Sequence, residues 1–440
     1  MPSALNRSIG LPHATAMVVG TIIGASIFVQ PSEVSRAVPT LTGILFVWVA
    51  AGALTWFGAS ICAELSSAFP QTGGVYVFLR EMFSPAAGFL WGWAMFWSMH
   101  SGIIAAIAVV VARYSVGAAA PGDARIRAVA VAAIVGLSAI NYAGVRPGSA
   151  VQTGLTLTKV VAIAMLLALL AGFGAGHVPV PAGRIDPHGF LKALVAGLFA
   201  FGGWHMVTYA AEETREPRRT IPRALMFGIA VVVAVYLALN TAYLFVLPLD
   251  RVRASERIAA DAAAAVAGPT AAGAISVLVV ISALGAMSGI ILAGPRVYYA
   301  MARDGLLFRW MGAIHPRFKS PHVAIVAQAI WSSVLVLTDT YRALFTRVVF
   351  TEWIFFGALA LGVMRLRGAA AYAPAFRAWG FPVAPILFAS ICLVIVINQI
   401  VSDPLESATG LALVAAGLPV YYRWIRVRPL EKTATCGTPP

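Results

Sequence analysis

Apolar residues run along almost the whole chain in stretches long enough to cross a membrane. The hydrocarbon core of a bilayer requires about 20 apolar residues per helix. The sequence predicts twelve such spans, at residues 13–31, 41–69, 83–112, 126–142, 151–173, 189–211, 221–247, 271–301, 323–337, 348–364, 382–401 and 408–424. We therefore expect an all-α integral membrane protein with twelve transmembrane helices and both termini on one side.

Composition supports this class. Of the 440 residues, 60% are hydrophobic and only 11% are charged, and the mean hydropathy is +0.86. A soluble domain carries about 25% charged residues, so a soluble enzyme, a fibrous protein and a disordered chain are excluded. The first residues lack the pattern of a cleaved signal peptide, and we expect the first span to remain in the mature protein.

The distribution of Lys and Arg predicts the orientation. Of the 31 Lys and Arg residues, 19 lie in segments on the side of the N-terminus, 11 lie on the opposite side and Lys159 lies inside a span. Cytoplasmic loops carry the excess of these residues. Both termini are predicted to be cytoplasmic, in a plasma (inner) membrane, so the net charge of +14 does not indicate nucleic-acid binding.

Two features indicate an internal repeat. Met82–Ala112 and Ala262–Pro295 contain no charged residue, which predicts long, tilted third and eighth helices. Spans one and six are both interrupted by glycines, in VVGTIIGASIF at 18–28 and LFAFGGW at 198–204. Both pairs lie five spans apart, an odd number that gives the two halves opposite topology. Paired interruptions of this kind are typical of a transporter site between inverted repeats, although a single glycine pair also suits close helix packing.

An interrupted membrane helix exposes backbone groups that hydrocarbon cannot satisfy. In span one, the N–H groups after the break, near Ala25 and Ser26, favour an anion. The carbonyl groups before the breaks, near Thr21–Ile23 and Phe199–Phe201, favour a cation. A site that accepts a carboxylate beside an ammonium suits a zwitterionic α-amino acid.

Six strings in order carry a family resemblance. VVGTIIGASIF, AELSSAFPQTGGVYVFLRE, LFAFGGWHMVTYAAEETREPRRTIPRAL, YLALNTAYLFVLP, SALGAMSGIILAGPRVYYAMARDG and TEWIFFG resemble helices of the amino acid–polyamine–organocation superfamily. Within it, the chain is most similar to the L-type amino acid transporters and their bacterial relatives. The resemblance covers residues 8–425.

The resemblance implies a leucine-transporter-type fold, with a five-plus-five inverted repeat and two further helices. The corresponding parts are a cytoplasmic segment at 1–12, repeats at 13–173 and 189–364, two helices at 382–424 and a cytoplasmic tail at 425–440. It also implies a secondary transporter with the amino acid as its small-molecule partner, no cofactor, no metal and no nucleic acid. Animal L-type relatives join a glycoprotein heavy chain through a cysteine between spans three and four. The loop Tyr114–Arg125 has no cysteine, so no disulfide-linked heavy chain is expected.

The resemblance also implies a binding site around the two breaks, with Phe199 as the outer gate. Two departures bear on specificity: Ala25-Ser26 follows Gly24 where relatives read Gly-Ser-Gly, and His205 stands where L-type relatives usually carry Asn. The residues expected at the substrate are Ile22, Ile23, Ala25, Ser26, Ile27, Phe199, Ala200, Gly202 and His205.

Lys159 is the one Lys or Arg well inside a predicted span. A cation at this depth costs about 2.5–3.5 kcal/mol on insertion scales. In the family, a lysine in the matching motif takes the place that sodium fills in sodium-coupled relatives, which implies contacts with carbonyls near Gly20 and with Ser282. Tyr236 and Asn240 lie on one helical face and form either an interhelical hydrogen-bond stripe or a secondary ligand contact. Glu352, at the start of the tenth span, is expected to be structural.

The sequence therefore predicts a sodium-independent secondary transporter of L-α-amino acids. Neutral substrates are expected because no acidic residue is predicted in the pocket, and an alternating-access exchanger is favoured. A proton-coupled symporter is the alternative, and a non-transporting amino acid sensor is a further one. No nucleophile–base spacing, nucleotide loop or metal motif supports an enzyme.

Overall fold

The protein is helical throughout the part that a computed structural model describes, residues 9–116, 124–143, 159, 161, 163–172, 186–318 and 320–427. Within these ranges the one extended pairing is an isolated bridge between Ile9 and Thr214. The helices are α1 (Leu11–Ile22), η1 (Ser26–Phe28), α2 (Gln30–Ala37), α3 (Leu41–Ala68), α4 (Val75–Met82), α5 (Pro85–Ala94), η2 (Met95–Met99), α6 (His100–Val116), α7 (Ala124–Tyr142), α9 (Pro187–Ala200), η3 (Trp204–Glu213), α10 (Pro217–Val246), α11 (Leu249–Ala254), α12 (Ile258–Arg303), η4 (Arg309–Gly312), α13 (His322–Thr338), α14 (Tyr341–Arg367), α15 (Val383–Ser402), α16 (Pro404–Ala415) and α17 (Gly417–Val427).

Eight helices in the described ranges are long and apolar enough to cross a membrane. They are α3, the continuous segment from α5 to α6, α7, the segment from α9 to η3, α10, α12, α14 and α15. Shorter apolar helices lie at Leu11–Ile22, Ile163–Gly172 and His322–Thr338. Much of the predicted fifth span, including 151–158, and the loop residues 117–123 lie outside the described part. The architecture is that of a multi-pass helical membrane protein.

The predicted start of the tenth helix was wrong. The tenth helix begins at Tyr341 rather than at residue 348, because the Thr340 side chain accepts a hydrogen bond from Ala343 N and caps the helix there. Glu352 therefore lies well inside α14 and not at its start. The eighth helix, α12, spans Ile258–Arg303, but non-helical backbone at Ala267 and Gly268 divides it directly before Pro269. Proline has no backbone N–H and cannot donate a hydrogen bond to the preceding turn. The long second part of α12 therefore begins close to residue 271, the predicted start of the span.

The first helix is interrupted at the position that its glycines predict. α1 ends at Ile22, the short 3₁₀ helix η1 covers Ser26–Phe28, and α2 continues from Gln30. The sixth is interrupted in the same way, because α9 ends at Ala200 and the 3₁₀ segment η3 begins at Trp204. Gly203 between them has a φ of +92°, which is accessible to glycine and strained for other residues.

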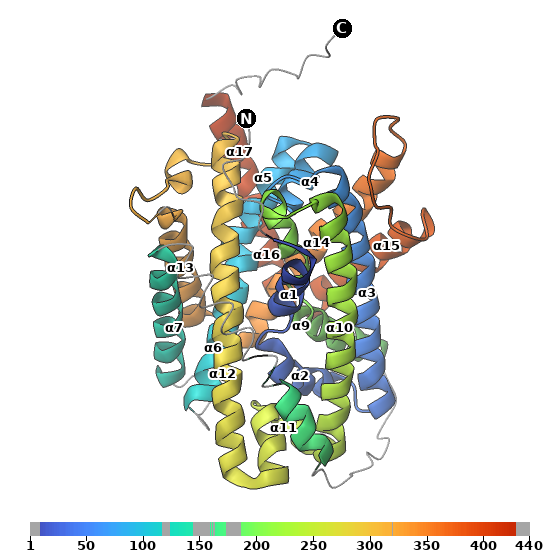
Figure 1. The fold of residues 1–440 in the computed structure, drawn as a ribbon, viewed down its shortest axis with the longest axis vertical. Helices are drawn as coiled ribbons and strands as arrows, with labels where there is room; N and C mark the ends of the chain where they lie inside the picture. The colour runs from blue at the N-terminus through green and yellow to red at the C-terminus, as the bar shows by residue number, and fades with distance from the viewer. Residues whose placement is uncertain are drawn as a thin grey trace.

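The interrupted first helix lies at the centre of the bundle, between α10 and α12 (Figure 1). α10 packs along α3 on one side and α1 on the other, and α12 packs against α6. Gly228 of α10 allows the close approach of α1, because a Cβ at this position would lie 2.5 Å from Val18 Cγ1. Small residues at such contacts are characteristic of membrane helix pairs. The fold thus surrounds the exposed backbone of α1 with protein.

Candidate functional site

The two interrupted helices contact each other through their exposed backbone. Thr21 Oγ1 lies 3.2 Å from Gly203 O and also donates within α1, at 2.8 Å from Met17 O. A Cβ at Gly203 would lie 3.2 Å from Thr21 O, closer than most real Cβ contacts. The left-handed glycine therefore brings the break of the sixth helix against that of the first.

Tyr236 of α10 joins the ends of the two helices. Its hydroxyl lies 3.0 Å from Ile22 O and 2.8 Å from Ala200 O, and its single proton is shared between the two carbonyl oxygens. Both carbonyls belong to last helical residues, which have no partner within their own helix. Asn240 Nδ2 donates to Tyr236 O at 2.8 Å. Tyr236 is thus a hydrogen-bond link between helices.

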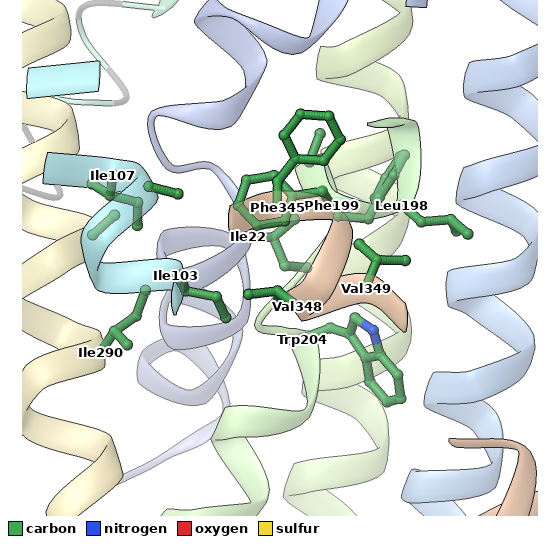
Figure 2. Packing of buried hydrophobic residues seen from close by; sticks show 14 of the residues in the cluster. Ile22, Ile103, Ile107, Leu198, Phe199, Trp204, Ile290, Phe345, Val348 and Val349 are labelled. Atoms are coloured by element: carbon green, nitrogen blue, oxygen red, sulfur yellow. The ribbon is translucent and has the colours of Figure 1, made fainter. Parts of the chain in front are cut away.

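A small cavity lies where the two breaks meet α6, α12 and α14. Its volume is about 20 Å³, which is roughly the space that one water molecule requires. Figure 2 shows aliphatic side chains that converge on it from these helices, among them Ile103, Ile107, Ile290 and Val348. The residues that line the cavity are Thr21, Ile22, Gly24, Ser26, Ile103, Ile107, Phe199, Gly202, Gly203, Met206, Ile290, Val348 and Glu352.

Phe199 covers one side of this cavity. It lies on the last turn of α9, is 6% exposed and packs against Phe345 of α14, with the ring centroids 5.6 Å apart (Figure 2). Aromatic pairs at this distance stabilise beyond the area that they bury. The pair therefore connects α9 to α14 beside the breaks.

Lys159 reaches the break of the first helix. Its side chain is 1% exposed and Nζ lies 2.8 Å from Gly20 O. Ser282, the other expected partner, is buried on α12, and its hydroxyl has no hydrogen-bond partner in the described part of the chain. An ammonium on a carbonyl of α1 places a positive charge at the interruption.

The expected substrate residues divide into two groups. Ile22, Ser26, Phe199 and Gly202 line the cavity. Ile23, Ala25, Ile27, Ala200 and His205 are buried beside the breaks but are not among the lining residues.

His205 lies in an aromatic environment. Its ring centroid lies 5.3–5.6 Å from those of Trp91, Trp204, Tyr209 and Phe356. The imidazole therefore packs among rings rather than along the cavity.

Glu352 is a cavity residue that the sequence analysis missed. The apolar pattern places it at the start of a span, whereas it lies inside α14, is 4% exposed and faces the cavity. An ionisable side chain within a membrane span is a functional candidate by default, and this signal was available. The expectation that the pocket contains no acidic residue was therefore wrong.

Comparisons with known proteins decide the family. A family model described as amino acid permease matches residues 9–421. The chain belongs to the amino acid permease family. It is therefore a membrane transporter and not an enzyme.

Individual relatives cover almost the whole permease. It is 30% identical to the Serine/threonine exchanger SteT of Bacillus subtilis (strain 168), over 96% of this chain and 97% of the relative. It is 28% identical to the b(0,+)-type amino acid transporter 1 of Homo sapiens, over 97% of this chain and 89% of the relative. The rat Large neutral amino acids transporter small subunit 2 is also 28% identical, over 95% of this chain and 81% of the relative.

Proposed function

We propose that the permease is a sodium-independent exchanger of neutral L-α-amino acids, with one central site between the breaks of the first and sixth helices. The observation that carries this proposal is the contact between the two breaks, which brings exposed backbone groups of both helices to one buried cavity. Relatives are named as a serine/threonine exchanger and as a transporter of large neutral amino acids. The shared feature of these names is an α-amino acid.

The backbone at the cavity suits both charges of such a substrate. The N–H groups at residues 25–27 follow the end of α1 and would bind the carboxylate. The carbonyl groups at the ends of α1 and α9 would accept hydrogen bonds from the ammonium. A carbonyl oxygen has two lone pairs. Ala200 O therefore retains acceptor capacity beside Tyr236, whereas Ile22 O also accepts a hydrogen bond from Gly24 N at 2.7 Å.

Lys159 supports independence from sodium. Its ammonium already supplies a positive charge at Gly20 O, so a sodium ion is not needed there. We propose that Lys159 bridges the first helix, α1, and Ser282 of α12 during transport. The bridge would couple the state of the binding site to the rocking of one helix bundle against the other. Replacement of sodium by choline should leave uptake unchanged, and uptake driven by a sodium gradient would contradict the proposal.

The proposal includes an arrangement in the membrane. The permease would have twelve spans in a leucine-transporter-type fold, with two inverted repeats of five helices and with both termini on the cytoplasmic side of the plasma membrane. We also propose that it is active without a heavy chain. The predicted heavy-chain loop includes residues 117–123, outside the described part. Transport by the purified chain alone would support independence from a second subunit, and strict dependence on one would contradict it.

Counterflow in proteoliposomes tests the function directly. Vesicles are loaded with one unlabelled amino acid, and entry of the same labelled amino acid is measured, over a panel of all twenty amino acids and putrescine. We expect trans-stimulated uptake of neutral amino acids. Absence of counterflow would favour a sensor, competition by arginine or putrescine alone would exclude neutral substrates, and accumulation driven by a pH gradient would indicate proton symport instead of exchange.

A further inference from the structure

Glu352 is a buried carboxyl group at the cavity with an unsatisfied oxygen. The side chain is 4% exposed, and Oε1 has no hydrogen-bond partner in the described part of the chain. The hydroxyl of the preceding residue, Thr351, is already engaged, because it lies 2.8 Å from Arg347 O and 3.1 Å from Ser98 Oγ. A buried acceptor without a donor is costly, so this oxygen is available to a ligand.

Two other carboxylates in the described part of the chain, the buried Glu64 and the partly exposed Glu406, are paired with arginine. Glu64 is fully buried and receives hydrogen bonds from Arg367, at 2.8 Å from Nε to Oε1. Glu406 receives one from Arg347, at 2.5 Å from Nη2 to Oε2. Glu352 has no such cation among the described contacts and instead faces the cavity. Its position is therefore not explained by a structural ion pair.

Glu352 lies on the side of the cavity opposite the helix breaks, where the proposed binding mode would direct the side chain of an amino acid. The proposed function places the substrate's carboxylate and ammonium on the breaks of the first and sixth helices. The side chain then faces the wall formed by α6, α12 and α14, which consists of Ile103, Ile107, Ile290 and Val348 together with Glu352. Glu352 is the hydrogen-bonding side chain of that wall.

We propose that Glu352 is the specificity-determining residue of this permease and accepts a hydrogen bond from the side chain of the substrate. The permease should then prefer amino acids with a hydroxyl group in the side chain over apolar amino acids of the same shape. This inference rests on the proposed function, since it requires the amino acid to bind with its backbone at the helix breaks.

Threonine and valine are the matched pair for the test, because they differ by a hydroxyl in place of a methyl. Serine and L-α-aminobutyrate form a second pair. Inhibition of labelled L-alanine uptake is measured in proteoliposomes for each compound and for arginine. For the wild type, we expect threonine to inhibit at about tenfold or more lower concentration than valine, because a site built around a hydrogen bond rejects the analogue that lacks the donor.

Three variants assign that preference to Glu352. Glu352→Leu removes the acceptor and should bring threonine and valine within about twofold to threefold of each other as inhibitors of the alanine uptake that this variant shows. Glu352→Gln keeps a carbonyl oxygen and should keep most of the preference. Glu406→Gln also removes a carboxylate, but outside the cavity, and should leave the threonine-to-valine ratio unchanged.

Each result is decisive. Equal inhibition by threonine and valine in the wild type would overturn the inference, as would a preference that survives in Glu352→Leu. Stronger inhibition by arginine than by threonine would reassign Glu352 to cationic side chains and overturn the hydroxyl preference. The wild-type ratio and the Gln variant remain informative if the Leu variant does not fold. Absence of uptake of any amino acid by the wild type would instead refute the proposed function and the inference with it.

Discussion

The Tyr236 hydroxyl is hydrogen-bonded to the ends of both interrupted helices. Tyr236→Phe therefore tests whether this link positions the two breaks for substrate binding. The substitution keeps the ring, which packs against Trp48 and Phe201 at centroid distances of 5.6 and 4.9 Å. It removes only the group that lies 3.0 Å from Ile22 O and 2.8 Å from Ala200 O. Because one proton is shared by the two acceptors, the change removes one hydrogen bond rather than two.

The expected magnitude follows from that count. A hydrogen bond between membrane helices contributes on average about 0.6 kcal/mol and at most about 1.7 kcal/mol, while an unsatisfied buried acceptor costs about 1–3 kcal/mol. We expect an effect of about 1–2 kcal/mol, or about 5- to 30-fold in an equilibrium constant. The bond fixes the two breaks at which the substrate backbone would bind. The apparent KM for uptake should therefore rise by this factor, with expression retained.

Tyr243 provides the matched control on the same helix. It is as fully buried as Tyr236, but its hydroxyl has no hydrogen-bond partner among the residues that the structure describes. Tyr243→Phe removes no hydrogen bond among the described residues, so it should change the free energy of unfolding and the KM less than Tyr236→Phe does. Counterflow kinetics and thermal unfolding of both purified variants give the comparison. Equal effects of the two substitutions, or a wild-type KM in Tyr236→Phe, would refute the reasoning.

Three further substitutions test other parts of the site. Phe199→Ala should raise the apparent KM about fivefold or more and lower turnover, because its aromatic contact is worth about 0.5–1.5 kcal/mol beyond buried area; wild-type kinetics would exclude a gate role. Gly203→Ala should destabilise the folded protein by about 1–3 kcal/mol, because φ at this residue is +92°. Gly136→Ala is the control and should not destabilise it, because the new Cβ would meet no described atom within 4 Å. Thermal unfolding measures both variants. Lys159→Ala should reduce transport about tenfold or more through loss of a charged hydrogen bond worth about 1.5–3 kcal/mol. Lys192→Ala removes an exposed charge and should leave it within about twofold; near-normal transport by Lys159→Ala would contradict the coupling role.

The helix breaks could be predicted from the sequence because their cause is local. Gly24 and Gly202–Gly203 interrupt otherwise apolar runs, and a backbone break in a membrane needs both a permissive residue and a polar environment. The structure has both interruptions where these residues lie. The contact between Lys159 and Gly20 O also follows the expectation, because an ammonium at this depth requires acceptors and an interrupted helix supplies them.

The far wall of the cavity could not be predicted in this way. Ile103, Ile107, Ile290 and Val348 come from α6, α12 and α14, and as aliphatic residues in apolar runs they look the same whether they face lipid or a site. Only the packing of helices distant in sequence selects them. Glu352 differs, because its charge marks it, and it was missed through the late start assigned to its helix.

The placement of His205 shows how local geometry limits the transfer of a motif. After Gly203 the chain continues as a 3₁₀ segment, in which three residues complete a turn and side chains at i and i+3 eclipse each other. Met206 therefore falls directly below Gly203, and both line the cavity. His205 is rotated by about a third of a turn, into the rings of Trp91 and Phe356. A residue that follows a helix break by two positions is thus directed by the type of helix that resumes, and the sequence pattern of apolar residues does not distinguish 3₁₀ from α over one or two turns. In this permease the resumed sixth helix thus presents Met206, and not His205, to the cavity.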